Sequence, residues 1–316
     1  MSCYGFRIKI FVLMGMLFLC ASSVYAETAE EYFNRGNTYY NQGNFSQAIL
    51  DYTKAIEINP KNAEAYDNRG NAYAKQDNLV QAISDYDKAI EINPNVALVY
   101  YNRGVIYAKQ GNSSQALIDF SKAIGINPDF EEAYCNRGLA YARQDNFSQA
   151  FSDYNKAIAI NSNFAETYNN RGTAYQKQGK FTEAISDYNK AIEIKPNFAE
   201  AYCARGFIYT KQGNFTEAIA DYTKAIEINP NYALAYCDRG LAYDMQGNIT
   251  QAISDHTKSI EINPNIPQTY HSRSIAYFRQ KEFTKAWDDV HKAESLGYTV
   301  DSEFLEDLKK ASGREK

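Results

Sequence analysis

Residues 32–60 have the sequence "YFNRGNTYYNQGNFSQAILDYTKAIEINP", and residues 66–94 repeat the pattern as "YDNRGNAYAKQDNLVQAISDYDKAIEINP". The period is 34 residues, and eight copies follow one another without an insertion. A fixed period of this length is typical of repeat architectures, in which each copy packs against its neighbours. The sequence therefore predicts eight units, which cover residues 29–62, 63–96, 97–130, 131–164, 165–198, 199–232, 233–266 and 267–300.

Each unit is expected to form two helices joined by a short turn. The first helix carries tyrosine at unit positions 4 and 11, and the second carries alanine and isoleucine at helical spacing. An Asn-Pro pair ends most second helices, because the residue before proline is pushed out of the α region. At the start of the second helix a hydroxyl is predicted to cap free backbone amides, and it comes from Ser46, Ser148, Thr182, Thr216 and Thr250.

The pattern Tyr-x2-Arg-Gly-x2-Tyr, followed by Ala-x3-Tyr, Ala and Pro, resembles the tetratricopeptide repeat. Tyr and Arg stand here in place of the Trp and Leu of the general pattern. The resemblance implies an all-α fold, a right-handed superhelical solenoid of antiparallel helix pairs whose first helices line a concave groove. Residues 301–316 are predicted to be a C-terminal capping helix and tail, with Phe304, Leu305 and Leu308 on one side of the helix.

The N-terminal stretch has the features of an export signal. Arg7 and Lys9 precede an apolar run from Ile10 to Cys20, and a segment with small residues ends at Ala26. We therefore predict a secretory signal peptide at residues 1–26 and a periplasmic or secreted location. The apolar run is shorter than the roughly 20 residues of a membrane span. We expect no stable membrane insertion after cleavage, and an uncleaved anchor is the alternative.

Composition and motifs argue against several functions. The formal net charge is −5 and no block of basic residues occurs, which does not favour nucleic acid as a partner. The five cysteines and three histidines lack the spacing of metal ligands and show no nucleophile–base arrangement. The sequence therefore predicts a protein that has no cofactor or metal and is not an enzyme.

Two charged positions of the unit are invariant within the chain. Position 7 is always arginine: Arg35, Arg69, Arg103, Arg137, Arg171, Arg205, Arg239 and Arg273. Position 23 is always aspartate: Asp51, Asp85, Asp119, Asp153, Asp187, Asp221, Asp255 and Asp289. These positions lie at matching heights in an antiparallel pair, so we predict a partly buried ion pair in which each charge requires the other. The resemblance to the tetratricopeptide repeat implies that glycine at position 8, such as Gly70, faces alanine at position 20, such as Ala82, and lets the helices approach closely.

Asparagine at position 6 is the first candidate for contact with a partner. It occurs in five consecutive units, as Asn34, Asn68, Asn102, Asn136 and Asn170. On first helices that line a groove, these amides would be spaced by one helix-packing distance of about 8–10 Å. Three extended residues span roughly 10 Å, so successive amides could bond the backbone of a peptide at every third residue. The alternative is that these asparagines cap helices or bridge neighbouring units.

Apolar residues near position 9 are the second candidate. They are Tyr101, Val105, Leu139, Phe207, Leu241, Ile275 and Phe278. Exposed apolar surface of this kind is typical of a partner site. The alternative is packing between adjacent first helices. Together the two sets predict a protein–protein interaction scaffold that binds extended or helical peptide segments in the concave groove. The rival hypothesis is a structural protein that forms homo-oligomers through its ends or its outer face.

Overall fold

The computed structural model describes residues 27–314, so the predicted signal peptide lies outside the described residues. Within residues 27–314 there are seventeen helices and no strand, which confirms the predicted all-α fold. The first helices of the eight pairs are α2 (Ala29–Asn41), α4 (Ala63–Lys75), α6 (Ala97–Lys109), α8 (Glu131–Arg143), α10 (Ala165–Lys177), α12 (Ala199–Lys211), α14 (Ala233–Met245) and α16 (Pro267–Arg279). The second helices are α3 (Phe45–Ile58), α5 (Leu79–Ile92), α7 (Ser113–Ile126), α9 (Phe147–Ile160), α11 (Phe181–Ile194), α13 (Phe215–Ile228), α15 (Ile249–Ile262) and α17 (Phe283–Ser295). The last helix is α18 (Ser302–Ser312).

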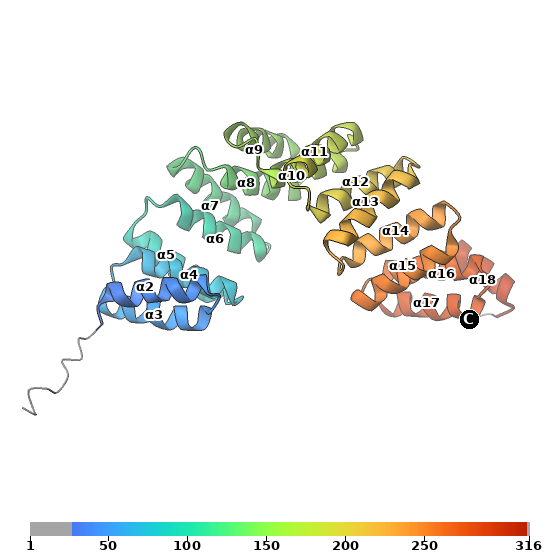
Figure 1. Ribbon diagram of the computed structural model, residues 1–316, viewed down its shortest axis with the longest axis horizontal. Coiled ribbons are helices and arrows are strands. Elements are labelled where there is room, and N and C mark those ends of the chain that lie inside the picture. The colour runs from blue at the N-terminus through green and yellow to red at the C-terminus, as the bar shows by residue number, and fades with distance from the viewer. Residues whose placement is uncertain (1–26, 315–316) are drawn as a thin grey trace, which may run out of the picture. The chain divides into compact units, whose positions relative to one another are not determined.

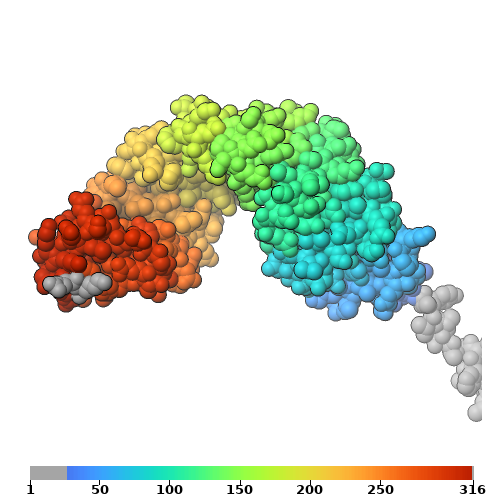
Figure 2. Space-filling model, turned by 180° about the vertical axis from the view of Figure 1, so that it is seen from behind, coloured from blue at the N-terminus to red at the C-terminus, as the bar shows by residue number. Residues whose placement is uncertain are grey.

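The chain divides into two compact units, unit 1 ending at Pro128 and unit 2 beginning at Asp129. Within each unit the two helices of a pair pack together, and the second helix also packs on the first helix of the next pair (Figure 1). Within each unit, the surfaces of successive pairs adjoin in chain order (Figure 2). First helices also contact one another directly, α2 with α4 and α4 with α6 in unit 1, and α8 through α16 in unit 2. First helices therefore form one continuous side of each unit.

The turn between the helices of a pair differs from the prediction in its cap. In α3 the N-cap is Asn44, whose side chain accepts a hydrogen bond from the Gln47 amide. The Ser46 hydroxyl lies inside the helix and accepts a bond of 2.8 Å from the Gln76 side chain of the next pair. The predicted hydroxyl cap is therefore wrong, because the residue before the helix occupies the cap position. The hydroxyl instead joins neighbouring pairs, and the same bond occurs between Thr216 and Gln246 and between Thr250 and Gln280.

Glycine at position 8 allows the close approach of helices that the sequence predicts, with a different main neighbour. A Cβ atom added to Gly70 would lie 2.8 Å from the ring of Tyr86 and 3.2 Å from the Ala82 carbonyl oxygen. Real Cβ atoms do not approach an aromatic ring so closely, so a larger residue would push the Tyr86 ring out of its place. The glycine thus makes room for the buried aromatic residue at position 24, and the alanine backbone is the secondary contact.

The predicted Arg–Asp pair is confirmed in all eight helix pairs. Arg69 donates from Nε and Nη2 to the two carboxylate oxygens of Asp85, at 2.8 and 2.7 Å. Its remaining nitrogen, Nη1, donates to the Thr53 hydroxyl of the preceding pair at 3.0 Å. Both charged side chains are largely buried, with 16% and 7% of their surface exposed. This bidentate geometry is the strongest form of the Arg–carboxylate interaction. The separate Nη1 bond ties this helix pair to the preceding one.

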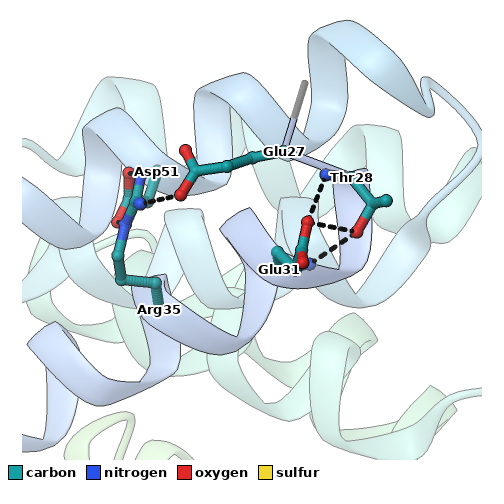
Figure 3. A network of polar contacts seen from close by, with 5 residues as sticks. All are labelled: Glu27, Thr28, Glu31, Arg35 and Asp51. Atoms are coloured by element: carbon teal, nitrogen blue, oxygen red, sulfur yellow. Dashed lines mark hydrogen bonds and ion pairs between the residues drawn. The ribbon is translucent and has the colours of Figure 1, made fainter. Parts of the chain in front are cut away.

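The first helix pair has no preceding pair, and the segment before it supplies the missing acceptor. Glu27 accepts a bond from Arg35 Nη1, while Asp51 takes the other two nitrogens (Figure 3). Next to it, Thr28 and Glu31 form a capping box at the start of α2 (Figure 3). Glu27 therefore takes the place of the acceptor that a preceding pair supplies to other arginines, such as Thr53 to Arg69.

At the other end, α18 packs on α17. Leu308 is fully buried, and Phe304 and Leu305 are partly buried against a cluster that includes Trp287 and Val290. The Trp287 indole N–H donates to the Ser312 hydroxyl at 3.1 Å, which fixes the end of α18. The helix therefore covers apolar surface that a further repeat would otherwise cover.

Candidate partner-binding site

Two position-6 asparagines of unit 1, Asn68 and Asn102, lie on first helices and bond to the preceding repeat. Asn68 is half-buried, and its side-chain N–H donates to the side-chain oxygen Oδ1 of Asn37 at 2.9 Å. The Tyr52 hydroxyl donates to the same oxygen at 2.8 Å. These three residues line a pocket of about 350 Å3 together with Tyr40 and Asn41. The side chain of Asn68 therefore lines a polar pocket, and its bond to Asn37 also joins α4 to α2.

Asn102 makes a second inter-repeat bond. Its side-chain N–H donates to the Asp67 carboxylate at 3.3 Å, and Asn71 donates to the same oxygen at 3.4 Å. Burial raises the pKa of Asp67 to about 6, although the two amides act in the opposite direction. In unit 2, Asn170 likewise donates to the Cys135 thiol at 3.4 Å, while Asn34 is exposed at the start of the chain. Asn68, Asn102 and Asn170 thus each use a side-chain N–H to bridge neighbouring repeats, as the alternative interpretation predicts.

A primary amide has two N–H donors and a carbonyl acceptor with two lone pairs, so one bridge does not exhaust it. Asn136 is half-buried on α8 and is also engaged in polar contact. The asparagine ladder therefore stays a prediction, made by residues that also support the stacking of repeats.

The predicted apolar residues divide into four groups. Val105 is the most open, with 37% of its surface exposed on α6, and the half-buried ring of Tyr101 on the same helix packs against Phe120. Phe278 belongs to the C-terminal cluster, where its ring lies 5.6 Å from that of Phe304. Leu139 and Ile275 are half-buried on α8 and α16. Phe207 and Leu241 come together in one pocket.

This pocket, which we call the α12–α14 pocket, has a volume of about 310 Å3 and lies in unit 2. Its lining includes Phe207 and Lys211 from α12, Phe215 from α13, and Asp238, Leu241 and Met245 from α14. Burial raises the pKa of Asp238 to about 6. The Lys211 ammonium lies 5.4 Å from the centre of the Phe207 ring. The pocket therefore combines apolar walls with one carboxylate.

Among the pocket residues that sequence reasoning missed are Phe215, Asp238 and Met245. Two of them leave a signal in the repeat comparison. Asp238 occupies position 6, where five earlier repeats have asparagine, and Met245 occupies position 13, where six repeats have lysine or arginine. Phe215 gives no such signal, because an aromatic residue at the start of the second helix is common in this chain.

The site contains no arrangement suited to metal binding. Among residues 27–314, no group of three His, Cys, Asp or Glu side chains is placed to hold a metal ion. Cys135, Cys203 and Cys237 are free and buried, and burial raises the pKa of the Cys203 thiol to about 12. A thiol with a raised pKa is a weak nucleophile. Over the same described range no helix is long and apolar enough to cross a membrane.

Family models for the tetratricopeptide repeat match the chain in an almost continuous series. The model described as "TPR repeat" matches residues 36–77, 70–111 and 206–247. Two models described as "Tetratricopeptide repeat" match residues 97–130, 131–164, 165–198 and 233–266 in one case and residues 187–220 in the other. The chain belongs to the tetratricopeptide repeat family. Membership of this family implies a role as a protein–protein interaction scaffold.

Comparison with solved structures also returns tetratricopeptide repeat proteins. A chain of the APC/C hetero-tetramer Cut9–Hcn1 has a TM-score of 0.67 and 17% identity, over 93% of this chain and 58% of that one. The present chain thus spans less than two thirds of that relative, and the likeness concerns the fold alone. YrrB, described as a TPR protein with an unusual peptide-binding site, has 28% identity and a TM-score of 0.46 over 58% of this chain and 95% of that one. MamA has 27% identity and a TM-score of 0.48 over 52% of this chain and 96% of that one. Comparison with curated proteins gives no match.

Proposed function

We propose that this tetratricopeptide repeat protein is a non-catalytic scaffold that binds segments of partner proteins along its first helices. The observation that carries the proposal is the combination of amides and partly exposed apolar side chains on those helices. In unit 1, Asn68 lines a polar pocket and Val105 is exposed. In unit 2, Phe207 and Leu241 line the α12–α14 pocket.

The two kinds of site suit different parts of a polypeptide. Amides that retain a donor and an acceptor can bond the backbone of an extended segment in any sequence. Apolar pockets take side chains and thereby select among sequences. We therefore assign backbone contacts to the asparagines of unit 1 and side-chain contacts to the α12–α14 pocket of unit 2.

The experiment starts from a random dodecapeptide phage library selected against the full chain. The selected peptides are then titrated calorimetrically with the wild type and with Val105→Glu and Leu241→Glu. Val105→Glu is expected to weaken the binding of peptides that contact unit 1, and Leu241→Glu the binding of peptides that occupy the α12–α14 pocket. Each loss of affinity is expected to be at least about tenfold, because a buried unpaired charge costs more than 1.4 kcal/mol. Ile118→Glu is the matched control, since Ile118 is 60% exposed on the second helix α7. Equal loss of affinity in the control and the first-helix variants would contradict the proposal.

Self-assembly is the second candidate function, and it has its own observation. On second helices of unit 1, Leu50, Val80 and Ile118 are 57%, 72% and 60% exposed. Exposed apolar side chains on one side favour association through that side. Sedimentation velocity over a hundredfold concentration range separates the two functions. Concentration-dependent oligomers that disappear in a Leu50→Glu, Ile118→Glu variant favour assembly, and a monomer at all concentrations contradicts it.

We also propose that the chain is exported and that cleavage after Ala26 leaves Glu27 as the first residue. The bond from Arg35 to Glu27 gives that residue a role at the start of the first repeat. Intact-mass analysis of the protein recovered from the exported fraction tests the assignment. A mass that begins at Glu27 supports it, and a mass that includes residues 1–26 contradicts it.

A further inference from the structure

The α12–α14 pocket surrounds a carboxylate that has no cationic partner. Among the residues that the structure describes, no lysine, arginine or histidine nitrogen lies within 4.0 Å of Asp238. Within residues 27–314 the Asp238 side chain has one polar contact, with the Cys203 thiol, whose Sγ lies 4.0 Å from Oδ2. A thiol is a weak hydrogen-bond donor, so it compensates little of the cost of removing a carboxylate from water.

The buried aspartates Asp67, Asp244 and those of position 23 have strong partners, whereas the half-buried Asp238 has only the Cys203 thiol among residues 27–314. The eight position-23 aspartates each take two bonds from an arginine. Asp67 accepts from Asn71 and Asn102, and Asp244 accepts from Arg279 at 2.8 Å. Asp238 stands at unit position 6, where Asn102 and Asn170 donate to the position-5 residue of the preceding unit, and that residue is here Cys203. The sequence thus replaces a bridging amide with a carboxylate that faces a thiol.

The walls around Asp238 define the shape and chemistry of a complementary group. Phe207 and Phe215 provide aromatic rings, and Leu241 and Met245 provide aliphatic surface. A matching group therefore carries a positive charge on an apolar stem. A guanidinium suits these walls better than an ammonium, because it is planar, weakly hydrated, stacks on aromatic rings and pairs with both oxygens of a carboxylate.

We propose that the α12–α14 pocket receives an arginine side chain of a partner polypeptide, with the guanidinium paired to Asp238 and stacked on an aromatic wall. The proposal rests on the scaffold function and specifies one of its recognition elements. It assigns Asp238 and Phe207 as specificity-determining residues for a basic side chain.

Replacing Lys211 tests whether the ligand of this pocket is positively or negatively charged. Its ammonium lies over the Phe207 ring, 5.4 Å from the ring centre, where an incoming guanidinium would stack. A basic ligand has to displace this ammonium, so Lys211→Ala is expected to tighten its binding. An acidic ligand would instead pair with Lys211 and would be repelled by Asp238. Lys211→Ala is therefore expected to raise the affinity for a basic ligand and to lower the affinity for an acidic one. Asp238→Asn is expected to have the opposite effect on each.

The methyl group of Met245 can report ligand binding to this pocket directly by NMR. It lines the pocket, is 59% exposed and is the only methionine in residues 27–316. The full chain is labelled with 13C at methionine methyl groups, and the Met245 signal is assigned by its loss in Met245→Leu. The probes are the pentapeptide acetyl-Ala-Ala-Arg-Ala-Ala-amide and three analogues with citrulline, lysine or glutamate at the centre. Citrulline keeps the shape of arginine and removes its charge.

The arginine peptide is expected to shift the Met245 signal and to bind at least tenfold more tightly than the citrulline peptide. Asp238→Asn is expected to abolish that tenfold preference, Lys211→Ala to increase affinity severalfold, and the control Asp67→Asn to leave affinity unchanged. Lysine is expected to bind more weakly than arginine. Circular dichroism melts of each variant show whether the fold is retained.

Several results would overturn the arginine assignment: an unchanged preference in Asp238→Asn, equal binding of lysine, or preferred binding of glutamate with loss in Lys211→Ala. Failure of the arginine peptide to bind wild type, while the selected dodecapeptides bind and Leu241→Glu weakens them, overturns this inference and leaves the scaffold function standing. Failure of both the pentapeptide and the dodecapeptides overturns both.

Discussion

Arg69 and Asp85 face each other across the helix pair α4–α5, and both carboxylate oxygens accept bonds from the same guanidinium, at 2.7 and 2.8 Å. Replacing either partner with leucine leaves the other charge largely buried without compensation, which costs about 3–5 kcal/mol. The double variant Arg69→Leu, Asp85→Leu buries no unpaired charge and is expected to be more stable than either single variant. Urea unfolding of the three variants measures this. Single variants that are no worse than the double would show that the two residues do not depend on each other.

Asn68 and Asn34 occupy the same position in consecutive units but differ in their contacts. The Asn68 amide donates to Asn37 of the preceding helix pair, whereas the Asn34 side chain is exposed. Asn68→Ala is therefore expected to lower the free energy of unfolding by about 1 kcal/mol, and Asn34→Ala to change it by less than about 0.5 kcal/mol. Equal effects in thermal melts would mean that the inter-repeat bond does not contribute to stability.

His256 replaces the buried tyrosine of position 24, and neither ring nitrogen has a hydrogen-bond partner. Burial, helped by nearby Arg273, lowers the pKa of His256 to about 4. The unfolded chain binds the proton near pH 6.5, so stability is lost as the pH falls from about 6.5 to about 4, by up to about 3 kcal/mol. His256→Tyr restores the residue that other repeats place against position-8 glycine, and it is expected to remove this part of the pH dependence. Parallel wild-type and variant curves from pH 7.5 to 4.5 would contradict the assignment.

Asp238 is expected to change stability with pH in the opposite direction to His256. Burial raises its pKa to about 6, above the unfolded value of about 3.9. The charged form therefore costs stability, and the cost develops as the pH rises from about 4 through 6. Asp238→Asn is expected to raise the melting temperature at pH 8 and to change it little at pH 4. A variant that is less stable than wild type at pH 8 would mean that the carboxylate has a favourable partner in the fold.

The fold was accessible from the sequence because eight copies of one unit act as an alignment within a single chain. The Arg–Asp pair followed from two invariant positions at matching heights, and the structure has it in every helix pair. The cap was predicted wrongly, since both Asn44 and Ser46 can cap a helix and only backbone geometry places Asn44 at the start of α3.

Only part of the candidate site could be predicted from the sequence. Phe207 and Leu241 are apolar where other units are polar, and this difference marked them. Asp238 differs from the asparagine of five earlier units, but that difference alone does not show a pocket, which is lined by residues from three helices. Phe215 reaches the pocket from a second helix and leaves no signal in the comparison of repeats.

The central claim is that first helices bind partner polypeptides, and photo-cross-linking tests it most directly. A selected dodecapeptide that carries benzoylphenylalanine is irradiated with the full chain, and the cross-linked residues are identified by mass spectrometry. The predicted cross-links lie on α4 and α6 of unit 1 or on α12 and α14 of unit 2. Cross-links confined to the second helices α3, α5 and α7, where Leu50, Val80 and Ile118 are exposed, would contradict the claim.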